Sequence, residues 1–123
     1  MSNIRYNEEQ EAFELPYKLW DRMITVRFYT DSEEDIMNNL SDIAVKLETV
    51  NGGKKKIAQI AADEGYYEGS AETLAENIVL KDIYVDIDDE EIVVCFTVSS
   101  DDGYMCSVNI ELYDSEFEIT GRN

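Results

Sequence analysis

The stretch "YVDIDDEEIVVCF", residues 84–96, decides the fold, because its two apolar runs alternate on either side of a group of acidic residues. A run in which every second residue is apolar is typical of a strand with one buried face. The acidic centre forms either a four-residue loop over 88–91 or a two-residue turn at Asp89-Glu90. Both turns give the same antiparallel register, with Ile87 opposite Ile92, Val85 opposite Val94 and Ile83 opposite Phe96. Every apolar residue of this hairpin then falls on one face, as a half-buried antiparallel pair requires.

The alternation continues to the end of the chain and predicts two more hairpins. A two-residue turn at 102–103 would bury the amide of Asn109, which costs about 1–3 kcal/mol if it stays unpaired. A three-residue loop over 101–103, with Gly103 in the left-handed conformation, is therefore expected. This loop places Val98, Phe96, Val94 and Ile92 opposite Cys106, Val108, Ile110 and Leu112. A last hairpin turning through 113–116 places Phe117 opposite Leu112, Ile119 opposite Ile110, and Glu111 opposite Glu118.

The N-terminal third of the chain combines strand and turn signals. "MITVRFY" (23–29) alternates as a half-buried strand. A shorter strand is expected around Phe13 and Leu15, and Pro16 is expected to begin a turn close to Trp20.

Between residues 31 and 78 the apolar residues recur at helical spacing. A first helix is expected to open at Ser32, with Asp35 completing a capping box, and to end at the glycines 52–53. Its apolar stripe consists of Ile36, Leu40, Ile43, Leu47 and Val50. A second helix is expected over 54–64, with Ile57, Ile60 and Ala61 inward and Gly65 as its stop, and Ser70 is expected to cap a short third helix carrying Leu74 and Ile78.

These elements predict an α+β fold that forms one domain over residues 1–123. The expected antiparallel sheet comprises a four-strand C-terminal meander plus the N-terminal strands, with two to three helices packed on one face. A chain of 123 residues with a hydrophobic fraction of 44% is long and apolar enough to build one such core.

The net charge of the chain limits the kinds of partner that it can bind. Ten basic against 28 acidic residues give a net charge of −18. Nucleic acid and anionic membranes are poor partners for such a chain, because binding to phosphate depends on Lys and Arg. A basic protein is the natural counterpart, since opposite fields steer association. The N-terminus carries no secretory pattern and no apolar run is long enough to span a membrane, so a soluble cytoplasmic protein is expected.

The acidic hairpin does not match a calcium loop. Counted from Asp86, the sixth position of an EF-hand is Glu91 instead of Gly, and the twelfth is Thr97 instead of Glu. A hairpin turn is the better interpretation here and for "SSDDG" (99–103). A module that binds a cation or small ligand through these acidic loops remains the alternative.

No catalytic constellation is apparent in the sequence. The predicted register puts Cys106 in the core and Cys95 on the other face, opposite Asn109, so two free thiols are expected. The chain has no His to activate a thiol or to complete a zinc site with two cysteines. "NGGKKK" (51–56) lacks the context of a phosphate-binding loop and is interpreted as a helix junction. A non-enzymatic protein without cofactor or metal is therefore expected.

The outer face of the predicted sheet is the strongest candidate for a binding site. The segment from 82 to 118 contains twelve acidic residues and neither Lys nor Arg. Like charges directly opposite one another are mildly destabilising, and docking of a basic partner would explain why they are kept together. The candidate partner-binding residues are Tyr84, Asp86, Asp88, Asn109, Glu111 and Glu118. Tyr84, Tyr104 and Tyr113 are candidate anchors.

Several segments resemble a group of small bacterial domains of unknown function. The matching segments are "AFEL" (12–15), Trp20, "ITVRF" (24–28), "TLAENIVLKDIYVDI" (73–87) and "SVNIELYDSEFEITG" (107–121). Members often carry a Gly-His pair where this chain has Gly103-Tyr104, so any role of that His does not transfer. Some of these domains look like immunity proteins encoded beside polymorphic toxins. The resemblance thus implies a protein that neutralises a basic toxin domain.

Overall fold

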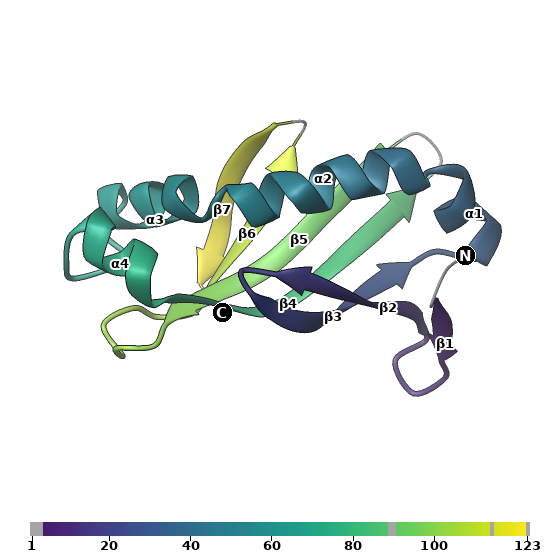
Figure 1. Cartoon of the computed structure of the whole chain (residues 1–123), viewed down its shortest axis with the longest axis horizontal. Coiled ribbons are helices and arrows are strands. Elements are labelled where there is room, and N and C mark those ends of the chain that lie inside the picture. Colours follow the sequence, from purple (N-terminus) through teal and green to yellow (C-terminus); the bar gives the residue numbers. More distant parts are fainter. Residues whose placement is uncertain (1–3, 89–90, 114, 123) are drawn as a thin grey trace.

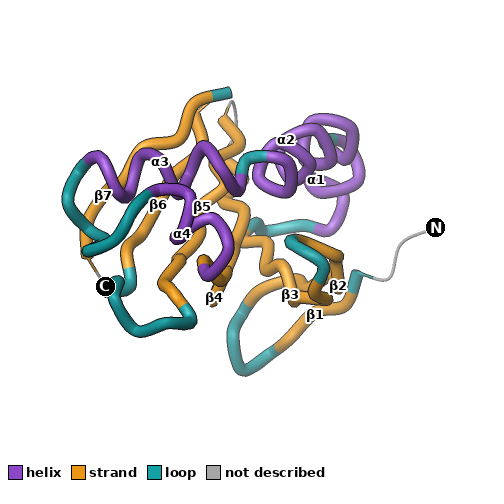
Figure 2. The backbone as a smooth tube through the Cα atoms, turned by 60° about the vertical axis from the view of Figure 1, so that its left-hand side comes forward, coloured by secondary structure: helices purple, strands orange, loops and turns teal. Residues whose placement is uncertain are grey.

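The computed structural model describes residues 4–88, 91–113 and 115–122, and over these residues it shows one seven-stranded sheet and four helices (Figure 1). The strands follow one another across the sheet in chain order: β1 (Arg5–Asn7), β2 (Ala12–Leu19), β3 (Arg22–Tyr29), β4 (Ile78–Asp88), β5 (Glu91–Ser100), β6 (Val108–Tyr113) and β7 (Glu116–Arg122). The helices are α1 (Glu33–Asn38), α2 (Leu40–Gly52), α3 (Lys54–Asp63) and α4 (Ala71–Asn77). Figures 1 and 2 show all four helices on the same side of the sheet. The fold is therefore mixed α+β, as predicted.

The register of the acidic hairpin is confirmed. Ile83 pairs with Phe96, Val85 with Val94, and Ile87 with Ile92. The turn proposed at Asp89-Glu90 lies outside the described residues. The last hairpin is also confirmed, since Leu112 pairs with Phe117, Ile110 with Ile119, and Glu111 with Glu118.

The register between β5 and β6 differs from the prediction by two residues. Val98 pairs with Val108 instead of Cys106, and Phe96 pairs with Ile110. The connection is longer than three residues because the loop makes its own contacts: Met105 forms a bridge with Tyr67, whose hydroxyl donates to Asp102 at 2.6 Å. Gly103 does adopt the left-handed conformation, with φ +80°. The alternation of faces is unchanged, because a slip of two residues preserves it.

The prediction that Cys106 is buried is wrong. Met105 is 7% exposed and takes the inward place, whereas Cys106 is exposed. Both cysteines are free thiols, as predicted.

The sheet is mostly, but not wholly, antiparallel. β3 and β4 pair in parallel over three residues each, Arg27–Tyr29 with Tyr84–Asp86. The four helices form the long connection between these strands, as parallel pairing requires. This pairing joins the N-terminal hairpin to the C-terminal meander and extends the outer face onto β3.

Pro16 does not begin a turn but lies within β2, paired with Thr25. A strand tolerates proline only where the missing N–H is not needed. That condition is met, because β1 pairs with β2 only as far as Glu14. The turn instead falls at Trp20 and Asp21, whose φ values of 51° and 62° form a tight hairpin connection. The indole of Trp20 donates to the carbonyl of Val50, which ties this turn to the end of α2.

The helical layer contains a break that the prediction did not include. Asn39 separates α1 from α2, and Leu40 at the break is 37% exposed instead of buried. Ser32 caps α1 as predicted, accepting from the N–H of Glu34, but Asp35 accepts from the hydroxyl of Thr30 and forms no capping box.

The later helices largely follow the prediction. The helix junction expected in "NGGKKK" is confirmed, since α2 ends at Gly52 and α3 begins at Lys54. Ser70 caps α4, Leu74 is buried, and Ile78 begins β4 instead of continuing the helix. Among the described residues, no helix is long and apolar enough to cross a membrane.

The core lies between the helices and one face of the sheet. Phe28, Ile83, Val85, Val94 and Ile110 point from the strands toward buried residues of all four helices. Alternate residues of the same strands therefore lie on the opposite face of the sheet, which no described element covers.

Candidate functional site

One row of residues crosses the uncovered face from the first strand to the last. Strand pairing places these residues side by side in the order Arg5, Glu14, Arg27, Tyr84, Cys95, Glu111 and Glu118. The row begins with cationic and mixed charges on β1–β3 and ends with two carboxylates on β6 and β7. We call the part of this surface formed by β4–β7 the open acidic face.

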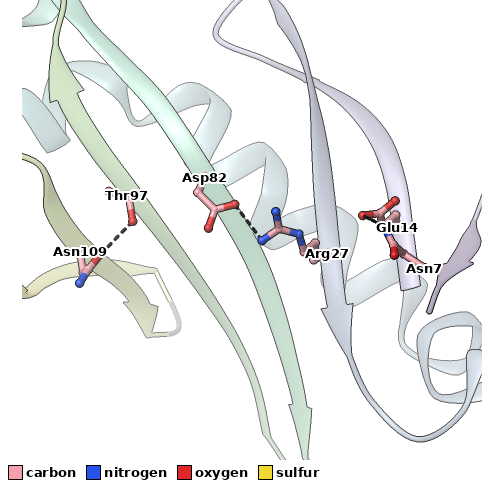
Figure 3. A network of polar contacts seen from close by, with 6 residues as sticks. All are labelled: Asn7, Glu14, Arg27, Asp82, Thr97 and Asn109. Carbon is pink, nitrogen blue, oxygen red and sulfur yellow. Dashed lines mark hydrogen bonds and ion pairs between the residues drawn. The ribbon is translucent and has the colours of Figure 1, made fainter. Parts of the chain in front are cut away.

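Arg27 marks the boundary between the two parts. Its guanidinium contacts the carboxylate of Asp82 at 3.4 Å, the one ion pair found among the described residues (Figure 3). This contact is long, and the Nε of Arg27 is buried without a hydrogen-bond partner in the described part of the chain. The single cation that β3 brings to this border is therefore only weakly engaged.

Tyr84 lies at the centre of the row and is held on two sides. Its ring packs edge-on against Tyr29, with the ring centroids 5.3 Å apart. Its interaction with the Cys95 side chain, together with burial and the nearby charges of Glu111 and Asp86, raises the pKa of Tyr84 to about 12. Burial also raises the pKa of the Cys95 thiol, with further contributions from the same two carboxylates. Both groups are therefore protonated at neutral pH.

The acidic end of the row carries two carboxylates directly opposite each other. Glu111 on β6 pairs with Glu118 on β7. The hydroxyl of Tyr113 donates to Oε1 of Glu111 at 2.6 Å, and this bond raises the pKa of Tyr113 to about 12. No cation of the described residues forms an ion pair with either carboxylate. Among the described residues, the hydroxyl of Tyr113 is the one group recorded in contact with this pair, and it carries no charge.

A second row, next to the first, is polar and uncharged at its centre. Thr97 on β5 donates to Oδ1 of Asn109 on β6 at 2.8 Å, which fixes the orientation of the amide (Figure 3). Thr120, at an irregularity in the pairing of β6 with β7, donates to the carbonyl of Asn109 at 3.2 Å. These two hydrogen bonds orient the side chain of Asn109 and engage its backbone carbonyl.

The centre of the open acidic face is hollowed. A depression of about 320 Å³ extends over β4–β7. Its lining includes the side chains of Asp82, Tyr84, Cys95, Thr97, Asn109, Glu111 and Thr120. Short side chains, above all those of Cys95 and Thr97, occupy the middle of β5, while Tyr84 and Glu111 stand on either side. The difference in side-chain length explains the hollow.

The structure brings most of the predicted site residues together. Tyr84, Asp86, Asn109, Glu111 and Glu118 share the open acidic face. Asp88 belongs to the same strand but lines a different depression, and Tyr104 lies in the loop after β5, 60% exposed and away from the face.

Sequence reasoning missed Arg27, Tyr29 and Asp82. Arg27 and Tyr29 alternate with the buried Val26 and Phe28, which places them on the outer side of β3. No local sequence pattern indicates that β3 pairs with β4.

The depression that Asp88 lines is the other acidic part of the surface. It has a volume of about 430 Å³, and its acidic lining consists of Glu11, Asp31, Asp35 and Asp88. Asp35 already accepts from the hydroxyl of Thr30 at 2.6 Å. Among the described residues, no group of three or more acidic or Cys side chains could hold a metal ion.

Comparison of the chain with protein-family models, curated proteins and solved structures finds no significant match.

Proposed function

We propose that this chain is a non-catalytic protein-binding domain whose open acidic face docks on a basic protein surface. The observation that carries the proposal is the Glu111–Glu118 pair, two carboxylates held opposite each other with no cation of the described residues bound to them. Such an arrangement costs stability in the free protein. A cationic partner would remove that cost on binding.

The composition of the face supports a protein partner. Interfaces are rich in tyrosine, and Tyr29, Tyr84 and Tyr113 all stand on this side of the sheet. The net charge of −18 produces a field that attracts cationic proteins and raises association rates by about 10- to 1,000-fold. The same field repels nucleic acid and anionic membranes.

The chemistry of the face supports a binding role over a catalytic one. Cys95 is the nucleophile nearest its centre, but its raised pKa keeps it as a thiol, and a thiol is a poor nucleophile. The hydroxyls of Thr97 and Thr120 are engaged with Asn109.

The most concrete version of the proposal is an immunity protein that neutralises a basic toxin domain, as the resemblance described above implies. The carboxylates of β4–β7 would occupy a cationic surface that otherwise binds an anionic substrate. A toxin that acts on nucleic acid has such a surface, because it must neutralise phosphates.

Charge reversal on the face tests this proposal. The probes are the purified proteins encoded by the genes on either side, with affinity measured by calorimetry at low and high salt. Glu111→Lys and Asp86→Lys are expected to weaken binding about tenfold or more. Glu76→Lys changes the charge by the same amount at an exposed position of α4, on the helical side, and is expected to leave the affinity nearly unchanged. If none of these proteins binds the chain, the immunity version of the proposal is wrong. If all three variants lose affinity equally, the open acidic face is not the binding surface.

A further inference from the structure

The carboxylates at the hollow in the open acidic face offer free hydrogen-bond acceptors. Three hydroxyl protons around it are already donated within the chain: Thr97 to Asn109, Thr120 to the Asn109 carbonyl and Tyr113 to Glu111. The carboxylates, by contrast, keep free oxygens. Asp82 and Glu111 each use one oxygen in a described contact, and Glu118 uses none. A group that fills the hollow must therefore bring several donors and positive charge.

The hollow also has an aromatic wall. The Tyr84 ring, held edge-on by Tyr29, stands on the β4 side, and Glu111 stands on the β6 side. Between them lies the uncharged floor of Cys95 and Thr97. A planar cation can stack on a tyrosine ring while its edge donates to a carboxylate, whereas a compact ammonium ion cannot do both as well.

We propose that the hollow receives the guanidinium group of an arginine side chain presented by the basic partner. Its plane lies against the Tyr84 ring, and its donors reach the free carboxylate oxygens of Glu111, which lines the hollow, and of Glu118, the cross-strand neighbour of Glu111. This inference rests on the proposed function and names the side chain by which the partner is anchored. Arginine has five N–H donors and no acceptor, which matches the free carboxylate oxygens at the hollow.

The volume and the neighbourhood of the hollow agree with this occupant. About 320 Å³ is at the small end of ligand-binding depressions and suits one side chain better than a whole ligand. The chain's own Arg27 already stands at the β4 border, in contact with Asp82 at 3.4 Å. Arg27 therefore partly compensates Asp82, whereas Glu111 and its cross-strand neighbour Glu118 form no ion pair with any described residue.

A titration of the full chain with small probes tests the inference without knowledge of the partner. The probes are N-acetylarginine methylamide and N-acetyllysine methylamide, and binding is followed by the amide signals of the ¹⁵N-labelled protein. The arginine probe is expected to shift the signals of Cys95, Thr97 and Glu111 first and to bind about threefold more tightly than the lysine probe. Glu111→Gln and Glu118→Gln are each expected to weaken it about threefold, the size of one exposed ion pair. Glu76→Gln, the matched control on α4, is expected to have no effect.

Equal affinity for the two probes, shifts scattered over all the acidic surface, or no shifts at all would each overturn the inference. Any of these results leaves the proposed function standing, because a basic surface can dock on the face without inserting an arginine. Conversely, a failed search among the neighbour-encoded proteins does not affect the probe titration. The two failures are therefore distinguishable.

Discussion

The two faces of the meander β4–β7 are built from alternate residues of the same strands, yet they differ in almost every property. Phe96 and Val94 on the helical face are 2% and 0% exposed, whereas their neighbour Cys95 on the open face is only half-buried. The helical face is mostly apolar, with Ser100 opposite Ile78 as a polar exception, and its apolar residues determine which residues pair. The open face carries hydroxyls, an amide and unpaired carboxylates. One face therefore stabilises the fold, while the other holds groups that stability alone does not explain.

The largest expected effect comes from the helical face. Phe96→Ala removes a buried ring that packs edge-on against Phe117, with centroids 5.9 Å apart. Deletion of a buried aromatic side chain costs about 3–5 kcal/mol of unfolding free energy. The matched substitution Cys95→Ala, one residue away on the open face, is expected to cost less than about 1 kcal/mol. Urea unfolding of the two variants measures the difference, and similar losses in both would mean that the two faces are not distinct in stability.

An intermediate effect is expected from the tyrosines of the open face at high pH. The pKa of Tyr84 and that of Tyr113 are raised to about 12, from an ordinary value near 10. A raised folded-state pKa means that the folded chain holds these protons more tightly than the unfolded chain. The stabilisation is complete below pH 10 and is lost as the pH rises from 10 toward 12. Melting temperatures are therefore expected to fall over that interval.

The variant Glu111→Gln separates the causes of this pH dependence. Glu111 accepts the hydroxyl of Tyr113 and is also the nearest charge to it, so its neutralisation is expected to bring the pKa of Tyr113 down toward 10. The pKa of Tyr84 is expected to change less, because the largest contribution to its rise comes from Cys95 and not from Glu111. Ultraviolet titration of tyrosinate in the wild type, Glu111→Gln and Tyr84→Phe assigns the steps, and an unchanged Tyr113 step would contradict the described contact.

The same contrast between faces explains what could be predicted from the sequence. The pairs Ile83 with Phe96 and Leu112 with Phe117 were predictable, because short turns join apolar runs of strict alternation. The pairing of Val98 with Val108 was not, since a contact between Met105 and Tyr67, far apart in sequence, sets the loop length.

The parallel contact of β3 with β4 also depends on long-range packing, here across the whole helical layer, and no local pattern encodes it. Most of the candidate site was nevertheless predictable, because a slip of two residues between β5 and β6 leaves the faces unchanged. The hollow itself was not, as it depends on which side chains stand side by side.

The smallest expected effect is a gain in stability instead of a loss. It tests most directly whether the Glu111–Glu118 pair is kept for binding. Glu118→Gln removes one of two like charges that face each other across β6 and β7. Because like charges in this arrangement destabilise a sheet, the variant is expected to be more stable than the wild type by about 0.2–1 kcal/mol at low salt. Salt screens the repulsion, so the gain should shrink as the ionic strength rises.

Glu76→Gln on α4 serves as the control for removal of any acidic charge from a chain of net charge −18. If Glu118→Gln gains more stability than Glu76→Gln and also binds the basic partner more weakly, the Glu111–Glu118 pair is kept for binding at a cost to stability. Equal gains in the two variants would mean that the effect is general charge repulsion and not specific to this pair.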